Sequence, residues 1–316
     1  MNFPKPLKKE DNVFLLCPSS PVIAEEDIKK CSEIIENMGY NAVIGKSLYE
    51  NYGGYMAGSA KIRVDDLHEA FSREDIKGIF CVKGGYSASQ LLDKLDYNLI
   101  ANNPKVFAGY SDITNLHIVF NQKCNLGTYH GPMVKSNMFN DFNEYTEKSF
   151  FEAIECSEWK YKEPENKSLS LLNAKNINDS VSHIKGILTG GNLAIIMASL
   201  GTPYEIDTKD KILFLEDVDE KIGSLDRMLT HLKYSGKLDD CNGIILGNFA
   251  DCKNTYETIN NQIYELDELL KDFFGNYDKP VIYGMESGHA KPYMATLPLG
   301  AECKINIKTK EITFTK

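Results

Sequence analysis

The chain has 316 residues, of which 42% are hydrophobic and 25% charged, so it has the composition of a folded globular protein and not of a disordered one. Its 35 basic and 45 acidic residues give a formal net charge of −10, which argues against a nucleic-acid backbone or an anionic membrane as the main partner. No apolar run reaches the roughly 18 residues of a membrane span, and the run 13–17 is too short for the core of a signal peptide. We therefore expect a cytoplasmic protein.

The cysteines point to the same compartment. There are 8 of them without a C-x-x-C pair, and several, such as Cys81, lie in apolar runs. This usage is typical of small buried side chains in a reducing compartment rather than of disulfides or a zinc site. The sequence therefore predicts no metal ion and no cofactor.

The first half alternates short apolar strands with helices. Apolar residues three or four apart between Ile28 and Met38 predict a helix that stops at Gly39. Continuous apolar strands separated by helices indicate an α/β fold with a mostly parallel sheet covered on both faces, as in flavodoxin-like and amidotransferase-like proteins. The other expected elements here are strands at 12–17, 77–82 and 104–108, and helices at 88–95 and 113–120.

The segment 163–179 is polar and aperiodic, which divides the chain into an N-terminal α/β domain at 1–162, a linker or mobile loop at 163–182, and a smaller C-terminal α/β domain at 183–316. The tail at 295–314 alternates apolar and polar residues and predicts a β-hairpin. The remaining expected elements are strands at 212–217, 242–247 and 280–284, and helices at 225–232 and 256–274.

Ser111 stands where a buried strand turns into a helix, in the run VFAGYSDIT. A serine on such a turn is lifted above the carboxyl edge of the sheet, and the amide of Asp112 would face the same space. The positive end of the helix favours a developing oxyanion there. The pattern G-x-S-x-G is only half met, because position 113 is Ile, and a serine that caps the helix explains the same run.

Two further groups lie at strand ends. Glu216 and Asp217 close the apolar run ILFL, where a carboxylate needs solvent or a partner, such as an imidazole that it holds in one tautomer. A salt bridge to Arg227 or a helix cap is the alternative. His289 lies in an irregular Gly-flanked loop beyond the strand at 280–284, at the edge where catalytic groups of α/β proteins collect.

Gly84, Gly85 and Tyr86 form another strand-to-helix turn. Two successive glycines let backbone amides approach an anion closely, although a plain tight turn explains them equally well.

Taken together, these segments resemble the L,D-carboxypeptidases of serine-peptidase family S66, which includes murein tetrapeptide carboxypeptidases and microcin C self-immunity hydrolases. The resemblance runs from about residue 12 to residue 305. It is carried by the successive blocks GGYSASQLLDKLDY, VFAGYSDIT, YHGPM, GGNLAIIMASLGTPYEID, LFLEDVDE, LDRMLTHL, GIILGNF and GHAKPYMATLPLG.

The resemblance implies a triad of Ser111, Glu216 and His289, with an oxyanion hole formed by the backbone amides of Gly85 and Asp112. It also implies a site at the junction of the two domains, usually in a homodimer. One departure is Ser87, where the GGY block of the family more often continues with Gly.

The resemblance leaves two substrates open. A murein tetrapeptide would lose its terminal D-alanine, whereas an aminoacyl-nucleotide would be cleaved between the acyl group and the nucleotide analogue. The family's nucleotide-cleaving branch resembles a design with a longer loop that carries a tryptophan. Here Trp159 lies at the edge of a short segment, and a single aromatic at a helix end is more often a packing residue. We therefore favour the peptide. Candidate substrate-binding side chains, by position, are Tyr86, Arg227, Lys291 and Lys83.

Two other classes of protein remain to be weighed. A wall-fragment binding module that has lost turnover is disfavoured because all three triad positions are filled. A cysteine-based amidotransferase-like domain is disfavoured because serine, not cysteine, stands at the turn.

Overall fold

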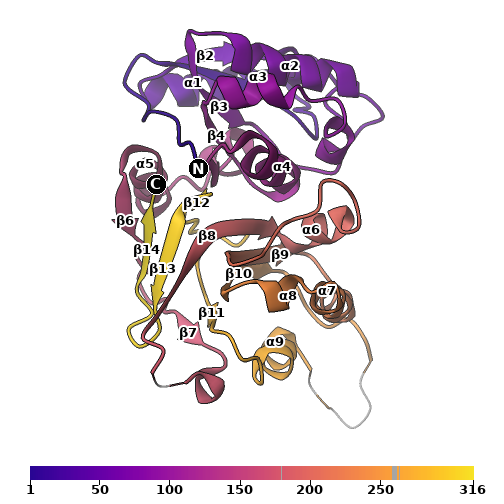
Figure 1. Ribbon diagram of the computed structural model, residues 1–316. Coiled ribbons are helices and arrows are strands. Elements are labelled where there is room, and N and C mark those ends of the chain that lie inside the picture. The colour runs from indigo at the N-terminus through magenta and orange to yellow at the C-terminus, as the bar shows by residue number, and fades with distance from the viewer. Residues whose placement is uncertain (179, 258–261, 263) are drawn as a thin grey trace.

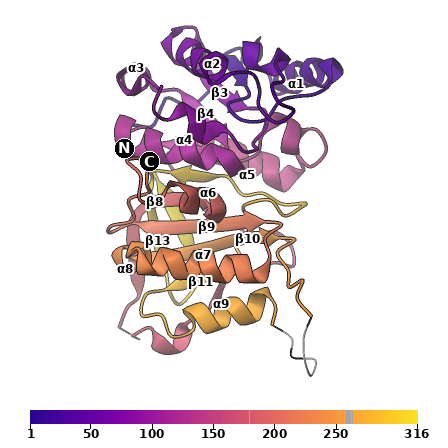
Figure 2. The same ribbon diagram turned by 90° about the vertical axis from the view of Figure 1, so that its right-hand side faces the viewer.

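Two β-sheets stacked one above the other define the molecule (Figure 1). The computed structural model describes every residue except 179, 258–261 and 263, and all bounds below refer to that part. Figure 2 shows that the two chain ends lie together near the junction of the halves. The expected mixed α/β fold class is confirmed.

The first sheet has the order β12-β5-β4-β3-β1-β2, in which β1 to β5 are parallel and β12 is antiparallel to β5. Because the parallel strands point the same way, the loops after them gather at one carboxyl edge. The strand bounds are β1 (Asn12–Leu16), β2 (Asn41–Ile44), β3 (Ile76–Cys81), β4 (Val106–Gly109), β5 (Thr128–His130) and β12 (Leu297–Leu299).

Helices cover both faces of this sheet because its strands are apolar on both sides. In β1, Val13 and Leu15 join the cluster with α1 and α5, while Phe14 and Leu16 join the cluster with α2, α3 and α4. The helix bounds are α1 (Glu25–Asn37), α2 (Ala60–Ser72), α3 (Tyr97–Asn102), α4 (Thr114–Cys124) and α5 (Glu144–Glu155).

The second sheet has the order β6-β14-β13-β8-β9-β10-β11-β7. The strands β8 to β11 are parallel, and the expected hairpin is confirmed as β13 and β14. The strand bounds are β6 (Glu158–Lys160), β7 (Ser170–Leu171), β8 (His183–Asn192), β9 (Ile212–Val218), β10 (Gly243–Ala250), β11 (Val281–Tyr283), β13 (Glu302–Asn306) and β14 (Ile312–Thr315).

One face of the second sheet is covered by four helices through a separate hydrophobic cluster. The other face joins the cluster that contains α1 and α5, so a continuous core links the two sheets. The helix bounds are α6 (Leu193–Ser199), α7 (Ile222–Tyr234), α8 (Lys237–Asp240) and α9 (Leu266–Phe274).

The domain boundaries expected at 162 and 183 stay a prediction. Three strands pair with the sheet on the other side of these boundaries. β6 and β7 come from before residue 183 yet pair with β14 and β11 of the second sheet. β12 comes from the second half yet pairs with β5 of the first. The second sheet is therefore the larger one in strand number, and the segment 163–182 contributes a strand, although residue 179 lies outside the described part.

Two expected helices are wrong in extent. The helix at 88–95 is only a 3-10 turn, Ala88–Leu91, because the Asp112 carboxylate holds the amide of Ala88 and Asp96 already caps α3. The helix at 256–274 is reduced to α9, because a capping box between Glu265 and Glu268 sets its start, and residues 258–261 and 263 lie outside the described part.

Gly190 and Gly191, at the end of β8, permit two close approaches, one to β9 of the same sheet and one to α4 of the first half. A Cβ added at Gly190 would lie 1.9 Å from the carbonyl oxygen of Phe214, and one at Gly191 would lie 2.5 Å from Oγ1 of Thr114. The amide of Asn192 donates to the same Thr114 Oγ1 at 3.1 Å. These glycines therefore let the second sheet contact the start of α4, the helix that follows Ser111.

Candidate active site

Ser111 occupies the sharp turn between β4 and α4. Its φ is +65°, a left-handed conformation that non-glycine residues adopt only at a cost of roughly 1–2 kcal/mol. A 3-10 turn over Ser111–Ile113 precedes α4, and no side chain caps either element. The helix-cap interpretation of Ser111 is therefore wrong, and the half-buried residue stands at the carboxyl edge in a strained backbone conformation.

The buried carboxylate of Asp112 holds the turn in place. It accepts hydrogen bonds from Ser19 Oγ, from the amide of Ala88 at 2.8 Å and from Asn115 Nδ2 at 3.0 Å. These donors come from the loop after β1, the loop after β3 and the start of α4. One carboxylate therefore joins three segments of the carboxyl edge.

The Gly84–Gly85 turn lies directly beside the serine. A Cβ on Gly84 would be 3.1 Å from Ser111 Oγ, and Gly85, with φ +142°, packs so closely on Ser20 that an added Cβ would be 1.9 Å from its Oγ. Within the described residues, neither the N–H of Gly85 nor that of Asp112 has a hydrogen-bond acceptor. Two unpaired amides thus flank the serine.

Glu216 and His289 form a buried pair from the second half. His289 Nδ1 lies 2.7 Å from Glu216 Oε2, and the side chains are 15% and 0% exposed. Because an ionised carboxylate can only accept, Nδ1–H donates and leaves Nε2 as the basic nitrogen. Glu216 therefore partners the imidazole, and the described residues show no ion pair between it and Arg227. The helix-cap alternative applies only to Asp217, which accepts from the amide of Ala194 in the first turn of α6 at 3.0 Å.

Glycines and a β-bulge bring His289 to Glu216. Between Leu246 and Phe249 of β10, two residues oppose the single Glu216 of β9. The chain leaving β11 crosses this bulge at Gly247, where an added Cβ would be 2.5 Å from the carbonyl oxygen of Ser287. Gly288 then passes Glu216 so closely that its own Cβ would lie 2.8 Å from Oε2.

The electrostatics suit a general base. Burial alone would lower the pKa of His289, but the charge of Glu216, the hydrogen bond to it and the nearby Asp217 raise that pKa above the usual 6.5. Burial also raises the pKa of Asp217 to about 6, although hydrogen bonds from Asn192 and from two backbone amides lower that pKa. The second oxygen of Glu216, Oε1, is buried and has no partner within the described part.

The imidazole of His289 lies against the first half. Its ring centroid is 4.7 Å from that of Tyr110, the residue before Ser111. The described residues show no hydrogen bond between Ser111 Oγ and His289 Nε2, a contact that often forms only with substrate bound. The structure therefore brings the three predicted triad residues to one junction.

Two other histidines lie beneath the turn. His117 is fully buried, with Nε2 2.9 Å from the carbonyl oxygen of Gly109 and Nδ1 2.9 Å from Thr128 Oγ1. Burial lowers its pKa to about 4, so the ring is neutral and Nε2–H donates to Gly109. Burial likewise holds the pKa of His130 well below its usual value, and neither of its ring nitrogens has a partner in the described part.

The other candidate side chains are more scattered. Tyr86 is 81% exposed beside Gly85, and Lys83 is half-buried one residue before Gly84. Arg227 is exposed on α7, and Lys291 pairs with Asp141 at 2.6 Å. Trp159 lies on β6, not at a helix end, and packs on Phe314 with 9% exposure, which confirms its interpretation as packing.

Arg63 and Ser19 were not singled out from the sequence. The guanidinium of Arg63 is fully buried and donates to the carbonyl oxygens of Pro18 and Ser87 and to Gln90. It thereby ties α2 to the loops after β1 and β3. The sequence signal for Arg63 is weak, because a charged residue beside the apolar stripe of a helix is also typical of the surface, and Asp66 of α2 is buried in the same way.

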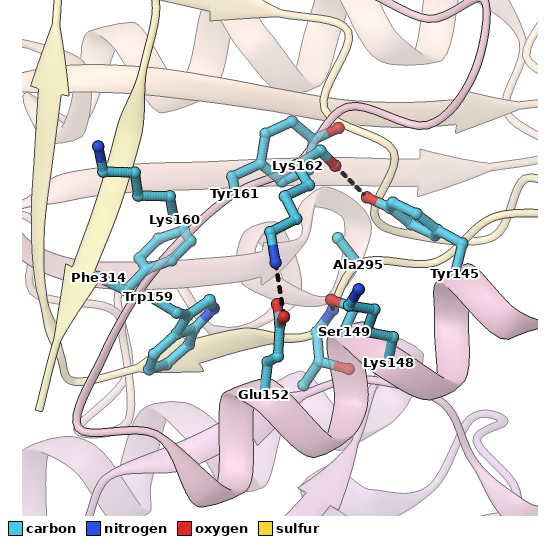
Figure 3. A pocket seen from close by; sticks show the side chains of 11 residues that line it. Tyr145, Lys148, Ser149, Glu152, Trp159, Lys160, Tyr161, Lys162, Ala295 and Phe314 are labelled. Carbon is cyan, nitrogen blue, oxygen red and sulfur yellow. Dashed lines mark hydrogen bonds and ion pairs between the residues drawn. The ribbon is translucent and has the colours of Figure 1, made fainter.

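The cavity drawn in Figure 3 lies between α5, β6 and the segment around Ala295. Its volume is about 30 Å³, room for one water. The Lys162–Glu152 ion pair and a hydrogen bond from Tyr145 Oη to the carbonyl oxygen of Lys162 cross it. A larger cavity of about 330 Å³ adjoins the His289 loop through Glu286 and Ala290.

The described part of the chain shows neither a metal site nor a membrane-spanning helix. No group of three His, Cys, Asp or Glu side chains there could hold a metal ion, and no helix there is long and apolar enough to span a membrane. All cysteines are free, and every one except Cys156 is buried.

The two-sheet fold, with a carboxylate–imidazole pair where the sheets meet, is that of an α/β peptidase, and both halves match models of one family. Residues 13–131 match the LD-carboxypeptidase N-terminal domain, and residues 185–305 match the LD-carboxypeptidase C-terminal domain. The chain therefore belongs to the LD-carboxypeptidase family, S66, as its sequence blocks indicate.

Relatives cover nearly the whole chain. A probable murein peptide carboxypeptidase of Bacillus subtilis (strain 168) is 35% identical over 311 residues, which are 97% of this chain and 92% of that protein. The structure of MccF in complex with glutamyl sulfamoyl guanosine has a TM-score of 0.86 at 25% identity, over 99% and 98% of the two chains. A muramoyltetrapeptide carboxypeptidase from Oxalobacter formigenes has the same fold, with a TM-score of 0.81 at 24% identity over 96% and 97%.

Proposed function

We propose that this protein is a serine carboxypeptidase that hydrolyses an L,D-peptide bond and releases D-alanine from murein tetrapeptides. The observation that carries the proposal is the buried Glu216–His289 pair packed on Tyr110, directly before Ser111. The identity to a probable murein peptide carboxypeptidase supports the substrate class.

In this mechanism Ser111 Oγ attacks the carbonyl carbon while its proton passes to Nε2 of His289. The amides of Gly85 and Asp112 stabilise the oxyanion of the tetrahedral intermediate. The intermediate collapses by breaking the C–N bond, and the amine of D-alanine takes the proton from His289. Water then cleaves the acyl ester by the same route, which restores Ser111 and releases the shortened peptide.

Glu216 keeps the imidazole in the Nδ1–H tautomer and stabilises its charged form. The backbone around Ser111 is likewise positioned before the reaction begins. The φ of +65° and the contacts of Asp112 hold the hydroxyl and the unpaired amides in place before substrate arrives.

The substrate also presents a carboxylate, at its D-alanine end, which needs a cation. Lys83 is the proposed cation, because it directly precedes Gly84, which lies beside Ser111 Oγ, whereas Lys291 is engaged by Asp141. Tyr86 is proposed as a substrate contact, while Arg227 is exposed on α7.

The second candidate function is hydrolysis of an aminoacyl-nucleotide conjugate. The likeness to MccF bound to glutamyl sulfamoyl guanosine favours it. Against it, the one tryptophan that could stack on a base is buried on Phe314. The homodimer and the cytoplasmic location expected from the sequence remain part of the proposal.

The test is incubation with a murein tetrapeptide and, separately, with an aminoacyl sulfamoyl-adenylate, followed by mass spectrometry of released D-alanine and free amino acid. We expect D-alanine release, and a loss of roughly 10⁴-fold or more in Ser111→Ala. Ser72→Ala, which changes an exposed serine at the end of α2, is the matched control and keeps the wild-type rate.

Release of amino acid only from the adenylate would move the assignment to the second candidate. Equal behaviour of wild type and Ser111→Ala on both substrates would favour the binding module.

A further inference from the structure

Exposed tyrosines gather at the carboxyl edge of the first sheet. Among the described residues, the large hydrophobic side chains exposed in the loops after β1, β2 and β3 are Ile23, Tyr49, Tyr52, Tyr55 and Tyr86, with exposed fractions of 76%, 64%, 64%, 45% and 81%. Large exposed apolar groups that cluster in one place mark binding surfaces, whereas scattered ones need no explanation. We call Tyr52, Tyr55 and Tyr86 the tyrosine rim.

The rim is connected to the serine by a short series of contacts. Gly84 lies beside Ser111 Oγ, and its carbonyl oxygen accepts from the amide of Ser20 at 3.1 Å. Ser20 Oγ in turn donates to the carbonyl oxygen of Tyr55 at 2.9 Å. Tyr86 follows Gly85, which packs on the same Ser20.

The backbone of the rim is fixed although its rings are exposed. Tyr52 and Met56 exchange two hydrogen bonds, of 2.8 and 3.1 Å, and the amide of Ala57 donates to the carbonyl oxygen of Ser19 at 2.9 Å. Ser19 also donates to the carboxylate of Asp112. A rigid backbone presenting uncovered aromatic rings loses little entropy when a ligand stacks on them.

We propose that the tyrosine rim binds the sugar of a muramoyl peptide, so that the enzyme prefers a tetrapeptide that still carries its muramic acid over the free peptide. The inference rests on the proposed function. The leaving group of that reaction is a single residue, so a surface that extends across two loops, after β2 and after β3, can serve only the long acyl side of the substrate.

The chemistry of the rim fits a sugar ring. A tyrosine offers an apolar face and a hydrogen-bonding hydroxyl, and a pyranose offers an apolar face of C–H groups and a rim of hydroxyls. In murein, the muramic acid is attached at the N-terminal end of the peptide, opposite the D-alanine that leaves. A stacked sugar on the rim would thus place the peptide between the rim and Ser111.

The experiment measures kcat/KM for the muramoyl tetrapeptide and for the free tetrapeptide, and compares their ratio between variants. We expect a ratio above 1 in the wild type that falls by roughly 3- to 10-fold in Tyr86→Ala and in Tyr55→Ala. Tyr86→Phe, which keeps the ring, retains most of the ratio. Tyr234→Ala is the matched control, because Tyr234 is 82% exposed on α7, away from this edge.

A second measurement separates this inference from the proposed function. Calorimetric titration of Ser111→Ala, with and without Tyr86→Ala, gives the affinity ratio of the two ligands without turnover. If wild type hydrolyses neither ligand, the proposed function fails, and the affinity ratio still decides whether the rim binds the sugar.

Four outcomes would overturn the inference. One is a ratio of 1 in the wild type, and another is a ratio that the rim substitutions leave unchanged. The third is that the rim substitutions weaken binding of an aminoacyl sulfamoyl-adenylate and not binding of the sugar. The fourth is that they abolish a dimer in analytical ultracentrifugation, which would make the rim an interface between copies of the chain.

Discussion

The residues of the proposed site come from both halves of the chain, and each half supplies a different chemical group. In the proposed mechanism Ser111 supplies a hydroxyl on a strained backbone, and Glu216 and His289 supply a base whose pKa is set by burial and charge. These opposing influences on His289 can be separated by removing the charge alone.

Glu216→Gln should lower kcat/KM by roughly 10⁴-fold and move the acid limb of its pH profile to lower pH. The base must be neutral, so activity falls as the pH drops through the raised pKa of His289. Without the charge of Glu216, the lowering effect of burial on the pKa of His289 is opposed mainly by the nearby Asp217, so that pKa falls. The pH dependence of kcat/KM checks this, together with NMR titration of His289 in Ser111→Ala.

An acid limb that stays in place after Glu216→Gln would contradict control of His289 by this carboxylate.

At the scale of elements, glycines decide which strands and helices can meet. Gly190 and Gly191 let β8 approach β9 and α4, while Gly247 and Gly288 let the loop after β11 cross β10. At each point a Cβ would overlap a neighbouring backbone or side-chain atom. The arrangement of elements at the junction therefore depends on glycine, which has no side chain, at these four positions.

Gly190→Ala should destabilise the protein by about 3 kcal/mol or more, because its Cβ would lie 1.9 Å from the carbonyl oxygen of Phe214 and the backbone there has φ +129°. Gly201→Ala is the matched control. It also has a positive φ, +78°, but nothing within 4 Å, so only about 1 kcal/mol of backbone strain is expected.

Urea unfolding of both variants measures the difference. Equal losses would mean that φ alone, and not the close approach of β8 to β9, requires glycine at 190.

For the whole molecule, the buried histidines beneath the serine turn make folding sensitive to acid. His117 has a pKa of about 4 in the folded protein against 6.5 when exposed, so it must stay neutral to remain buried. Its contribution to stability, about 3 kcal/mol, is fully present above pH 6.5 and is lost as the pH falls towards 4. His130 acts in the same direction, and His289, with a raised pKa, acts in the opposite one.

His117→Asn should therefore reduce the loss of unfolding free energy between pH 7.5 and pH 5 by about 2 kcal/mol, although it lowers stability at both. Urea unfolding at the two pH values provides the measurement. His231→Asn, at an exposed position of α7, is the control and keeps the wild-type dependence. An unchanged pH dependence in His117→Asn would show that His117 is not the sensitive group.

The sequence by itself determined the fold class and most of the strands, and its resemblance to the S66 family supplied the three residues of the proposed triad. Apolar runs bounded by glycine and polar residues specify buried strands locally, and β4 followed by Ser111 is one of these signals. The element limits near 88–95 and 256–274 were wrong because a carboxylate distant in sequence and a capping box set them.

Only the tertiary structure decided which groups meet. The pairing of Glu216 with His289, 73 residues apart, depends on a bulge and on two glycines whose importance lies in the chain that crosses them. The return of β12 to the first sheet and the burial of Arg63 and His117 are equally non-local. The physical reason is that burial, close approach and a raised or lowered pKa belong to an environment assembled from distant segments, whereas strand and helix signals are carried by neighbouring residues.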